Sequence, residues 1–354
     1  MIERLKKIRQ LLKRKKIDAV IITNPYNRRY LSGFDGSAGM LLISLEKAFL
    51  VTDFRYVEQA AAQAEQFTIH RWQDNLIKSL AMLIDNEGWL KIGFESKHVV
   101  CSIYDEMKEK LPVELFSLSD TAEKQRMIKS EDELAALRFG TKILDQAFNH
   151  ICSFIRPGIT EREVALELEI YLLRQGAEEK SFHFIVASGK RGAMPHGTAS
   201  TKELTRGELI TIDFGAVFGG YATDMTRTVA LGAVSQRQIE IYDIVKEAQQ
   251  KASLAIKPGL KGREVDAVAR DTIVKAGYGE YFGHGLGHGI GLETHEEPVL
   301  NPQSSTVLKA GMVATVEPGI YIPEWGGVRI EDMVVVTKSS VNLLTSSPRE
   351  LIII

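Results

Sequence analysis

The first third of the chain alternates between short apolar runs and segments in which apolar residues recur every three or four positions. Short apolar runs predict strands, and the longer spacing predicts amphipathic helices. The expected strands cover 17–23, 40–44, 48–52, 67–72 and 91–95, and the expected helices cover 1–16, 54–66, 74–86 and 102–111. Asn24-Pro25 predicts a turn after the first strand. Strands that alternate with helices indicate an α/β domain.

A polar stretch over 117–129 interrupts this alternation and ends at a strong helix start. Ser130 is a suitable N-cap, and Glu133 stands at the capping-box position. The helices expected beyond it cover 131–155, 161–175, 235–256 and 262–276, and the strands cover 182–188, 208–217, 221–231, 313–318 and 328–337. We therefore expect two domains, 1–121 and 122–354, the second an α+β domain whose strands line one central cavity.

Two short segments suggest an internal duplication in the second domain. Pro157-Gly158 and Pro258-Gly259 each end one expected helix and lead into another. Proline cannot continue a helix and glycine readily ends one, so each pair marks a helix–helix connection.

Composition narrows the class of protein. The 354 residues are 44% hydrophobic and 25% charged with a net charge of −2, which favours neither nucleic acid nor a membrane surface as partner. The basic residues of 1–16 alternate with leucine and isoleucine, which is typical of a solvated amphipathic helix. No secretory signal and no run of ~20 apolar residues is present, and two cysteines are too few for a disulfide framework. The expected location is the cytoplasm.

The segment Gly283–His295 carries His284, His288 and His295, three of the chain's eight histidines, among closely spaced glycines. Glycine costs up to ~1 kcal/mol relative to alanine inside a helix, so the spacing of His284 and His288 does not indicate a helical ligand pair. A glycine-rich backbone suits close approach or unusual dihedral angles. The segment is either a flexible loop with incidental histidines or an active-site segment that aims imidazoles at a metal and a substrate.

Four acidic residues lie in or beside apolar strands. Asp213 and Asp224 flank the hairpin signal Phe218-Gly219-Gly220, and Glu317 and Glu331 flank the turn signal Trp325-Gly326-Gly327. A buried ionised carboxylate is costly unless it is paired or binds a metal. Each acid alone could be a salt-bridged structural residue, but four of them together with the histidine segment favour a metal site.

Carboxylates with one imidazole are a ligand set for two divalent ions ~3.5–4 Å apart that share a nucleophilic water. Oxygen-rich coordination favours manganese or cobalt, with zinc possible. Such a centre lowers the pKa of the water and polarises a carbonyl, so hydrolysis of an amide or ester is the natural chemistry.

In order and local context these residues resemble the ligands of the pita-bread metallopeptidases, the creatinase/aminopeptidase P/prolidase superfamily. The motifs that carry the resemblance are Met194-Pro195-His196-Gly197, Asp224-Met225-Thr226-Arg227-Thr228, His284–His295, Glu317-Pro318-Gly319-Ile320-Tyr321 and Val328-Arg329-Ile330-Glu331-Asp332. Tyr30–Phe34 and Thr52–Tyr56 resemble the creatinase/prolidase-type N-terminal domain. The resemblance implies a bacterial or archaeal Xaa-Pro peptidase, either prolidase or aminopeptidase P, that acts on short peptides with proline second and forms a homodimer.

The resemblance also implies a role for each matched residue. Asp224 and Glu331 would bridge both ions, Asp213 would chelate one, and His288 with Glu317 would complete the other. Glu317 would also shuttle the proton of the bridging water. The residues that would contact substrate or orient a ligand are His196, His284, His295 and Arg329, with Tyr221 and Thr226 as weaker candidates for support. An outer ion pair is the alternative for Arg329.

One position departs from the family pattern. Val299 follows Glu296-Glu297-Pro298, where many relatives carry an arginine linked to recognition of a dipeptide's free carboxylate. Strict dipeptidase specificity is therefore in doubt. Methionine aminopeptidase shares the five ligands but typically lacks an N-terminal domain of this size, and creatinase lacks the metal site. A catalytically inactive pita-bread module that binds a protein partner is the remaining alternative.

Overall fold

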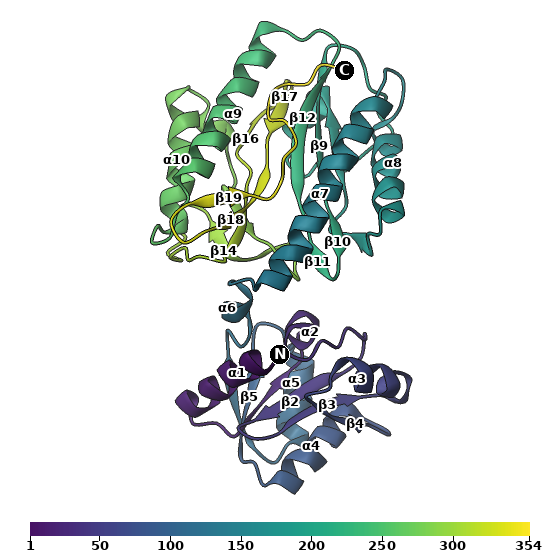
Figure 1. Cartoon of the computed structure of the whole chain (residues 1–354), viewed down its shortest axis with the longest axis vertical. Coiled ribbons are helices and arrows are strands. Elements are labelled where there is room, and N and C mark those ends of the chain that lie inside the picture. The colour runs from purple at the N-terminus through teal and green to yellow at the C-terminus, as the bar shows by residue number, and fades with distance from the viewer. The chain divides into compact units, whose positions relative to one another are not determined.

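The computed structural model describes residues 1–354 and divides them into two compact units, Met1–Arg126 and Met127–Ile354 (Figure 1). The boundary predicted from the sequence lies after residue 121. In the structure, α6 (Glu123–Arg126) is the last element of the first unit.

The first unit is built on one six-stranded sheet with strand order β4-β3-β2-β1-β5-β6. Its strands are β1 (Ala19–Ile22), β2 (Met40–Ser44), β3 (Ala48–Thr52), β4 (Thr68–Arg71), β5 (Lys91–Glu95) and β6 (Glu114–Leu118). The pairs β1–β2 and β2–β3 are antiparallel, and the other neighbours are parallel. The α/β domain is confirmed. Strand β6, an edge strand in which only Leu118 is buried, was not predicted from the sequence.

The helices of this unit are α1 (Ile2–Lys15), α2 (Pro25–Ser32), the 3-10 helix η1 (Phe54–Tyr56), α3 (Val57–Gln63), α4 (Leu76–Glu87) and α5 (Cys101–Lys110). The turn expected at Asn24-Pro25 is wrong. The Asn24 side chain accepts hydrogen bonds from the main-chain N–H groups of Tyr26 and Asn27, and Pro25 opens α2. The same residue types serve as an N-cap and first helical residue, so the pair did not decide between turn and helix.

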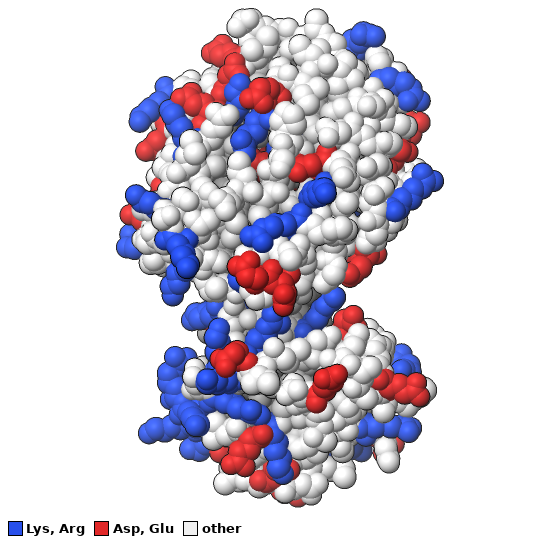
Figure 2. Space-filling model, in the orientation of Figure 1, with Lys and Arg blue, Asp and Glu red and all other residues white.

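Helix α1 is the amphipathic helix that the sequence predicts. Leu5, Ile8 and Leu12 are buried, whereas its lysines are exposed. Figure 2 shows the resulting concentration of basic side chains over α1. None of the helices in the structure has the length and apolarity of a membrane span.

The second unit holds the remaining strands in small sheets. They are β7 (Glu179–Lys180), β8 (Ile185–Ser188), β9 (Glu208–Phe214), β10 (Ala216–Phe218), β11 (Tyr221–Ala222), β12 (Met225–Leu231), β13 (Gly287–Gly289), β14 (Glu296–Leu300), β15 (Val313–Val316), β16 (Gly319–Ile322), β17 (Gly326–Arg329), β18 (Asp332–Val336) and β19 (Val341–Leu343). The sheet orders are β12-β9-β8, β14-β13-β15-β18-β19, β11-β10-β7 and β16-β17. The expected hairpins at Phe218–Tyr221 and Ile322–Gly326 are both present.

Two helix pairs flank these strands (Figure 1). They are α7 (Glu131–Phe154) with α8 (Glu161–Arg174), and α9 (Gln236–Ala255) with α10 (Gly262–Lys275); the short 3-10 helices are η2 (Gly189–Ala193) and η3 (Gly279–Tyr281). The first pair packs in one apolar core with β8, β9 and β12, and the second packs in another with β15 to β18. This is the expected α+β architecture, with the strands between the helix pairs.

The two helix pairs are anchored in equivalent ways, which supports the duplication suggested by the sequence. The N–H of Gly158 donates to the carbonyl of Leu204, and the N–H of Gly259 donates to that of Leu308. Both glycines have positive φ, 87° and 94°. The next helix in each half then forms matching bridges to an extended segment, Thr160 with Glu203 and Lys261 with Val307.

Candidate metal centre

The first two candidate acids lie where β9 and β12 run side by side. Asp213 is in β9, opposite Thr226 of β12, and Asp224 directly precedes β12. The strand expected over 221–231 is therefore two strands, with a break at Thr223-Asp224. The break lets the Asp224 side chain leave the ladder and enter the cavity described below.

Glu317 and Glu331 form the second pair. Glu317 follows β15 and Glu331 precedes β18. These two strands are antiparallel neighbours, and Val316 of β15 pairs with Asp332 of β18. The main-chain N–H of Glu331 donates to the carbonyl of Thr226 at 3.0 Å. This bond joins the two acidic strand pairs, which belong to different sheets.

His288 lies in β13, between β14 and β15, so the centre of the histidine segment is part of a sheet, whereas His284 and His295 lie outside the strand. The flanking glycines serve close approach. A Cβ on Gly287 would lie 2.1 Å from the Thr315 carbonyl oxygen, and one on Gly289 would lie 2.3 Å from that of Glu297. The glycines of this segment are absent from the positive-φ residues of the chain, so unusual dihedral angles are not their function here.

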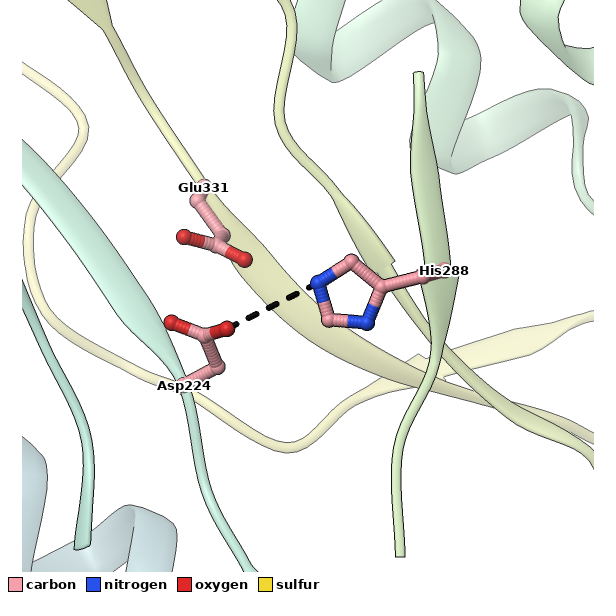
Figure 3. Close-up of side chains that lie close together, drawn as sticks. All are labelled: Asp224, His288 and Glu331. Atoms are coloured by element: carbon pink, nitrogen blue, oxygen red, sulfur yellow. Dashed lines mark ion pairs between the residues drawn. The ribbon is translucent and has the colours of Figure 1, made fainter. Parts of the chain in front are cut away.

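The ligand atoms of Asp224, His288 and Glu331 all lie within 4.8 Å of one another (Figure 3). His288 Nε2 is 3.7 Å from Asp224 Oδ2 and 3.4 Å from Glu317 Oε1. Three carboxylates therefore meet one imidazole nitrogen at spacings that a shared cation can fill.

The environment of His288 selects its tautomer. Nδ1 is 3.0 Å from the carbonyl oxygen of Gly289, which can only accept, so Nδ1 carries the proton. Burial lowers the pKa of His288, which keeps the ring neutral at pH 7. The Nε2 lone pair then faces the carboxylates, as a metal ligand requires.

Each of three buried carboxylates has an oxygen without a hydrogen-bond partner: Asp213 Oδ1, Asp224 Oδ1 and Glu331 Oε1. Burial, and then repulsion from the neighbouring acids, raises the pKa of Asp224 and of Glu331, and burial raises the pKa of Glu317. An arrangement that leaves buried oxygens unpaired and carboxylates crowded is unfavourable unless cations offset it.

The nine residues predicted to bind metal or substrate line a single cavity of about 480 Å³. These residues are His196, Asp213, Asp224, His284, His288, His295, Glu317, Arg329 and Glu331. The ring of His295 packs against that of His288, with centroids 4.2 Å apart. The cavity is also lined by residues that were not predicted as site residues from the sequence, namely Phe182, His183, Ile185, Thr198 and Asn301.

Arg329 is buried, and its ion pair is with the candidate ligand Asp213 inside the cavity instead of with an outer residue. Its Nη2 donates to Asp213 Oδ2 at 2.6 Å, its Nε to Thr226 Oγ1 at 3.1 Å and its Nη1 to the Tyr321 hydroxyl at 3.0 Å. Thr226 in turn donates to Glu331 Oε2 at 2.7 Å. The guanidinium and the threonine hydroxyl thus orient two of the candidate ligands.

His284 is held by Tyr321. Nδ1 lies 2.7 Å from the Gly285 carbonyl oxygen and Nε2 lies 2.9 Å from the Tyr321 hydroxyl. Burial lowers the pKa of His284, so the neutral ring accepts from Tyr321 at Nε2. Tyr321 stands in a motif quoted from the sequence, but its residue type alone gave no indication of this contact.

Support for the histidine segment also comes from α10. Asp266 Oδ1 accepts from the main-chain N–H of Leu286, and Arg270 donates to the carbonyls of Phe282 and His284. The only sequence signal was an i, i+4 acid–base pair, which is common on helices. The cavity lining does not include Tyr221, whose hydroxyl donates to Glu133.

Comparison with known proteins follows the same division of the chain. Residues 4–128 match the creatinase/prolidase N-terminal domain, and residues 135–338, more than half of the chain, match metallopeptidase family M24. The chain belongs to metallopeptidase family M24. The resemblance stated from the sequence is thereby confirmed.

Among solved structures, an Xaa-Pro dipeptidase from Bacillus anthracis is 48% identical with a TM-score of 0.98, covering 100% of this chain and 99% of that one. The prolidase from Pyrococcus horikoshii OT3 is 40% identical with a TM-score of 0.94, covering 99% and 100%. An X-Pro aminopeptidase from Thermotoga maritima is 38% identical with a TM-score of 0.90, covering 96% and 98%. The fold is shared by proteins of both specificities.

Membership of the M24 metallopeptidases implies divalent metal ions, and the residues present fit them. The fit rests on the unpartnered buried oxygens of Asp213, Asp224 and Glu331 and on the free Nε2 lone pair of His288. Hard oxygen donors with one imidazole suit divalent ions of the manganese, cobalt or zinc type.

Proposed function

We propose that this protein is a metal-dependent Xaa-Pro peptidase, which hydrolyses the bond between an N-terminal residue and a following proline. The observation that carries the proposal is the convergence of unpartnered buried carboxylate oxygens and a neutral imidazole in one cavity. The specificity for proline is drawn from the relatives, of which both the dipeptidases and the aminopeptidase act on Xaa-Pro bonds by their names.

In this proposal two divalent ions bind per subunit, with manganese first and cobalt or zinc as alternatives. Asp224 and Glu331 would be shared between the ions, Asp213 would help to hold one, and His288 with Glu317 would help to hold the other. The spacing of Asp224, His288 and Glu331 supports this division, and so does the orientation of Asp213 by Arg329. When bound, the ions supply a water of lowered pKa and polarise the scissile carbonyl.

The protein's own groups then handle the protons. Glu317 accepts the proton of the attacking water, and its Oε1 is oriented by the Thr315 hydroxyl at 3.1 Å. The nitrogen of the scissile bond belongs to proline, carries no hydrogen in the peptide and must be protonated as it leaves. His196 and His295 are exposed at the cavity, where solvent reaches them, and they deliver this proton, while His284 contacts the substrate.

Dipeptides and longer peptides are both substrates in this proposal. The names of two of the relatives favour dipeptide hydrolysis. Val299 favours an additional aminopeptidase activity, because this neutral side chain lies on the cavity wall beside Asn301. Without a cationic side chain at this position, binding does not require the substrate to end in a free carboxylate directly after proline.

We include a homodimer in the proposal, because two-fold symmetric dimers are the most common oligomers. Light scattering coupled to size-exclusion chromatography tests this part independently. A monomeric mass with full peptidase activity would remove the dimer and leave the catalytic proposal intact.

The deciding experiment assays the chelated protein after addition of manganese, cobalt or zinc, on Ala-Pro and on Ala-Pro-Ala. We expect metal-dependent release of alanine from the dipeptide and, because of Val299, from the tripeptide. Glu331→Gln should lose at least about a hundredfold in kcat, whereas Glu240→Gln, an exposed residue of α9, should match the parent. No metal-dependent release from either peptide would reject the Xaa-Pro peptidase and leave the protein-binding module and methionine aminopeptidase as the remaining interpretations.

A further inference from the structure

The proposed function gives no role to Arg227, although it lies in the Asp224–Thr228 motif of the metal centre. Its side chain is 1% exposed and is surrounded by acceptors. Nη1 donates to the main-chain carbonyls of Thr226, at 2.9 Å, and of Glu331. Nη2 and Nε donate to the carbonyls of Ser347, at 2.7 Å, and Pro348, at 2.9 Å. One guanidinium therefore joins the metal-bearing strands to the C-terminal segment.

Asp332 neutralises this guanidinium and gathers further donors. Its side chain is fully buried, and Oδ1 accepts from Arg227 Nη2 and from the Thr345 hydroxyl, each at 2.7 Å. Oδ2 accepts from Gln249 Nε2, at 2.7 Å, and from Arg349 Nε. Asp332, which directly follows Glu331, is thus hydrogen-bonded to α9 and to both ends of the segment Thr345–Arg349.

The consequence for the metal centre follows from the position of Glu331. Its N–H donates to the carbonyl of Thr226 and its own carbonyl accepts from Arg227, so its main chain is fixed on both sides. Its Oε2 accepts from Thr226, whose carbonyl Arg227 also holds. Because β12 and β18 belong to different sheets, no continuous ladder sets their relative position at this point.

We propose that Arg227 is a positioning residue of the metal centre, and that the C-terminal segment Thr345–Arg349, through Asp332, is part of the support that places Glu331. The inference rests on the proposed function insofar as it presumes the metal centre. A purely structural role for Arg227 predicts something different, namely a loss of stability that any equally destabilising core substitution would reproduce without a specific loss of metal affinity.

The test uses three substitutions of increasing severity in the full-length protein. Thr345→Val removes one donor to Asp332, Arg349→Gln removes a partly exposed cation, and Arg227→Lys keeps the charge but loses the planar fork of donors. The matched control is Leu168→Ala in α8, a buried residue of the second unit that contributes no hydrogen bond to this network. Cobalt affinity by calorimetry, the visible absorption of the cobalt-loaded protein and Tm are measured for each.

We expect Arg227→Lys to weaken cobalt binding by about 10- to 100-fold and to alter the absorption bands, as loss of outer support for ligands does. Arg349→Gln and Thr345→Val should produce smaller changes of the same kind, and Leu168→Ala should keep the parent's affinity and spectrum at a similarly lowered Tm. If Arg227→Lys fails to fold, the other two variants decide.

Parental affinity and spectrum in every variant that folds would overturn the inference while the proposed function stands. The same would hold if Leu168→Ala reproduced the losses. A parent protein that binds no cobalt would instead overturn the proposed function, and this inference with it.

Discussion

Arg329 and Asp213 form a buried ion pair on the wall of the cavity, with Arg329 Nη2 2.6 Å from Asp213 Oδ2. The other oxygen, Asp213 Oδ1, is buried without a partner. The guanidinium therefore takes one oxygen of the carboxylate and fixes the direction of the other. A carboxylate held in this way is oriented toward an ion, with Oδ1 free of hydrogen bonds from the protein.

Arg329→Lys should weaken this orientation, because lysine cannot reach Asp213, Thr226 and Tyr321 with one rigid fork. We expect manganese affinity to fall about 10- to 100-fold and kcat on Ala-Pro to fall with it. Titration with manganese followed by activity measures both. Arg162→Lys, on the exposed face of α8, is the matched control. Parental values for Arg329→Lys would show that Asp213 does not depend on this pair.

Gly287 offers a second test, because its neighbour in the same segment, Gly283, provides the control. A Cβ on Gly287 would lie 2.1 Å from the Thr315 carbonyl oxygen, whereas a Cβ on Gly283 would meet no atom within 4 Å. Gly287→Ala should push β13 from β15 and displace His288, so kcat should fall at least about tenfold and Tm by several degrees. Gly283→Ala should match the parent in both assays. Equal behaviour of the two variants would contradict the close-packing argument.

Much of the fold follows from local pattern. Ser130 and Glu133 form the capping box that the sequence predicts at the start of α7, and the Gly219-Gly220 turn closes the predicted hairpin. The turn predicted at Asn24-Pro25 was wrong because turns and helix starts favour the same residue types. Strand β6 escaped prediction because it is an edge strand whose residues show little burial.

From the sequence, only those site residues could be predicted whose residue type itself indicates metal binding or proton transfer. Acids in apolar strands and histidines among glycines are unusual enough to be noticed, and the structure brings them to one cavity. Tyr321, Asp266 and Arg227 act through hydrogen bonds to main-chain or ring atoms far away in the sequence. Such contacts depend on the tertiary arrangement, which local periodicity does not contain.

The two cysteines should differ sharply in reactivity. Cys101 is exposed, whereas burial raises the pKa of Cys152 to about 11. At pH 8 only about one in a thousand molecules would then carry the Cys152 thiolate, the reactive form. A disulfide reagent should label one thiol rapidly in the native protein and two after denaturation. Cys101→Ser should abolish the rapid phase, and a rapid phase that survives in this variant would contradict the assignment.

The last prediction concerns the metal-free protein, in which burial, and then Glu331 and Asp213, raise the pKa of Asp224. An unfolded aspartate has a pKa of about 3.9, so above that pH the folded state binds more protons than the unfolded state. The stability contributed by this carboxyl is therefore lost as pH rises through its folded pKa, at about 1.4 kcal/mol for each pH unit between the two values.

Asp224→Asn removes that titration, so in a chelating buffer at pH 7.5 the variant should have a higher Tm than the parent, although it lacks a ligand. The difference should shrink as the pH is lowered toward 5, because protonation relieves the same repulsion in the parent. Added manganese should reverse the order, since ligand binding to the folded state stabilises the parent more than a variant with weakened affinity. Thermal melts of both proteins from pH 5 to 8, with chelator and with manganese, provide the measurement. A chelated parent that melts above Asp224→Asn at pH 7.5 would show that Asp224 is satisfied by the protein alone.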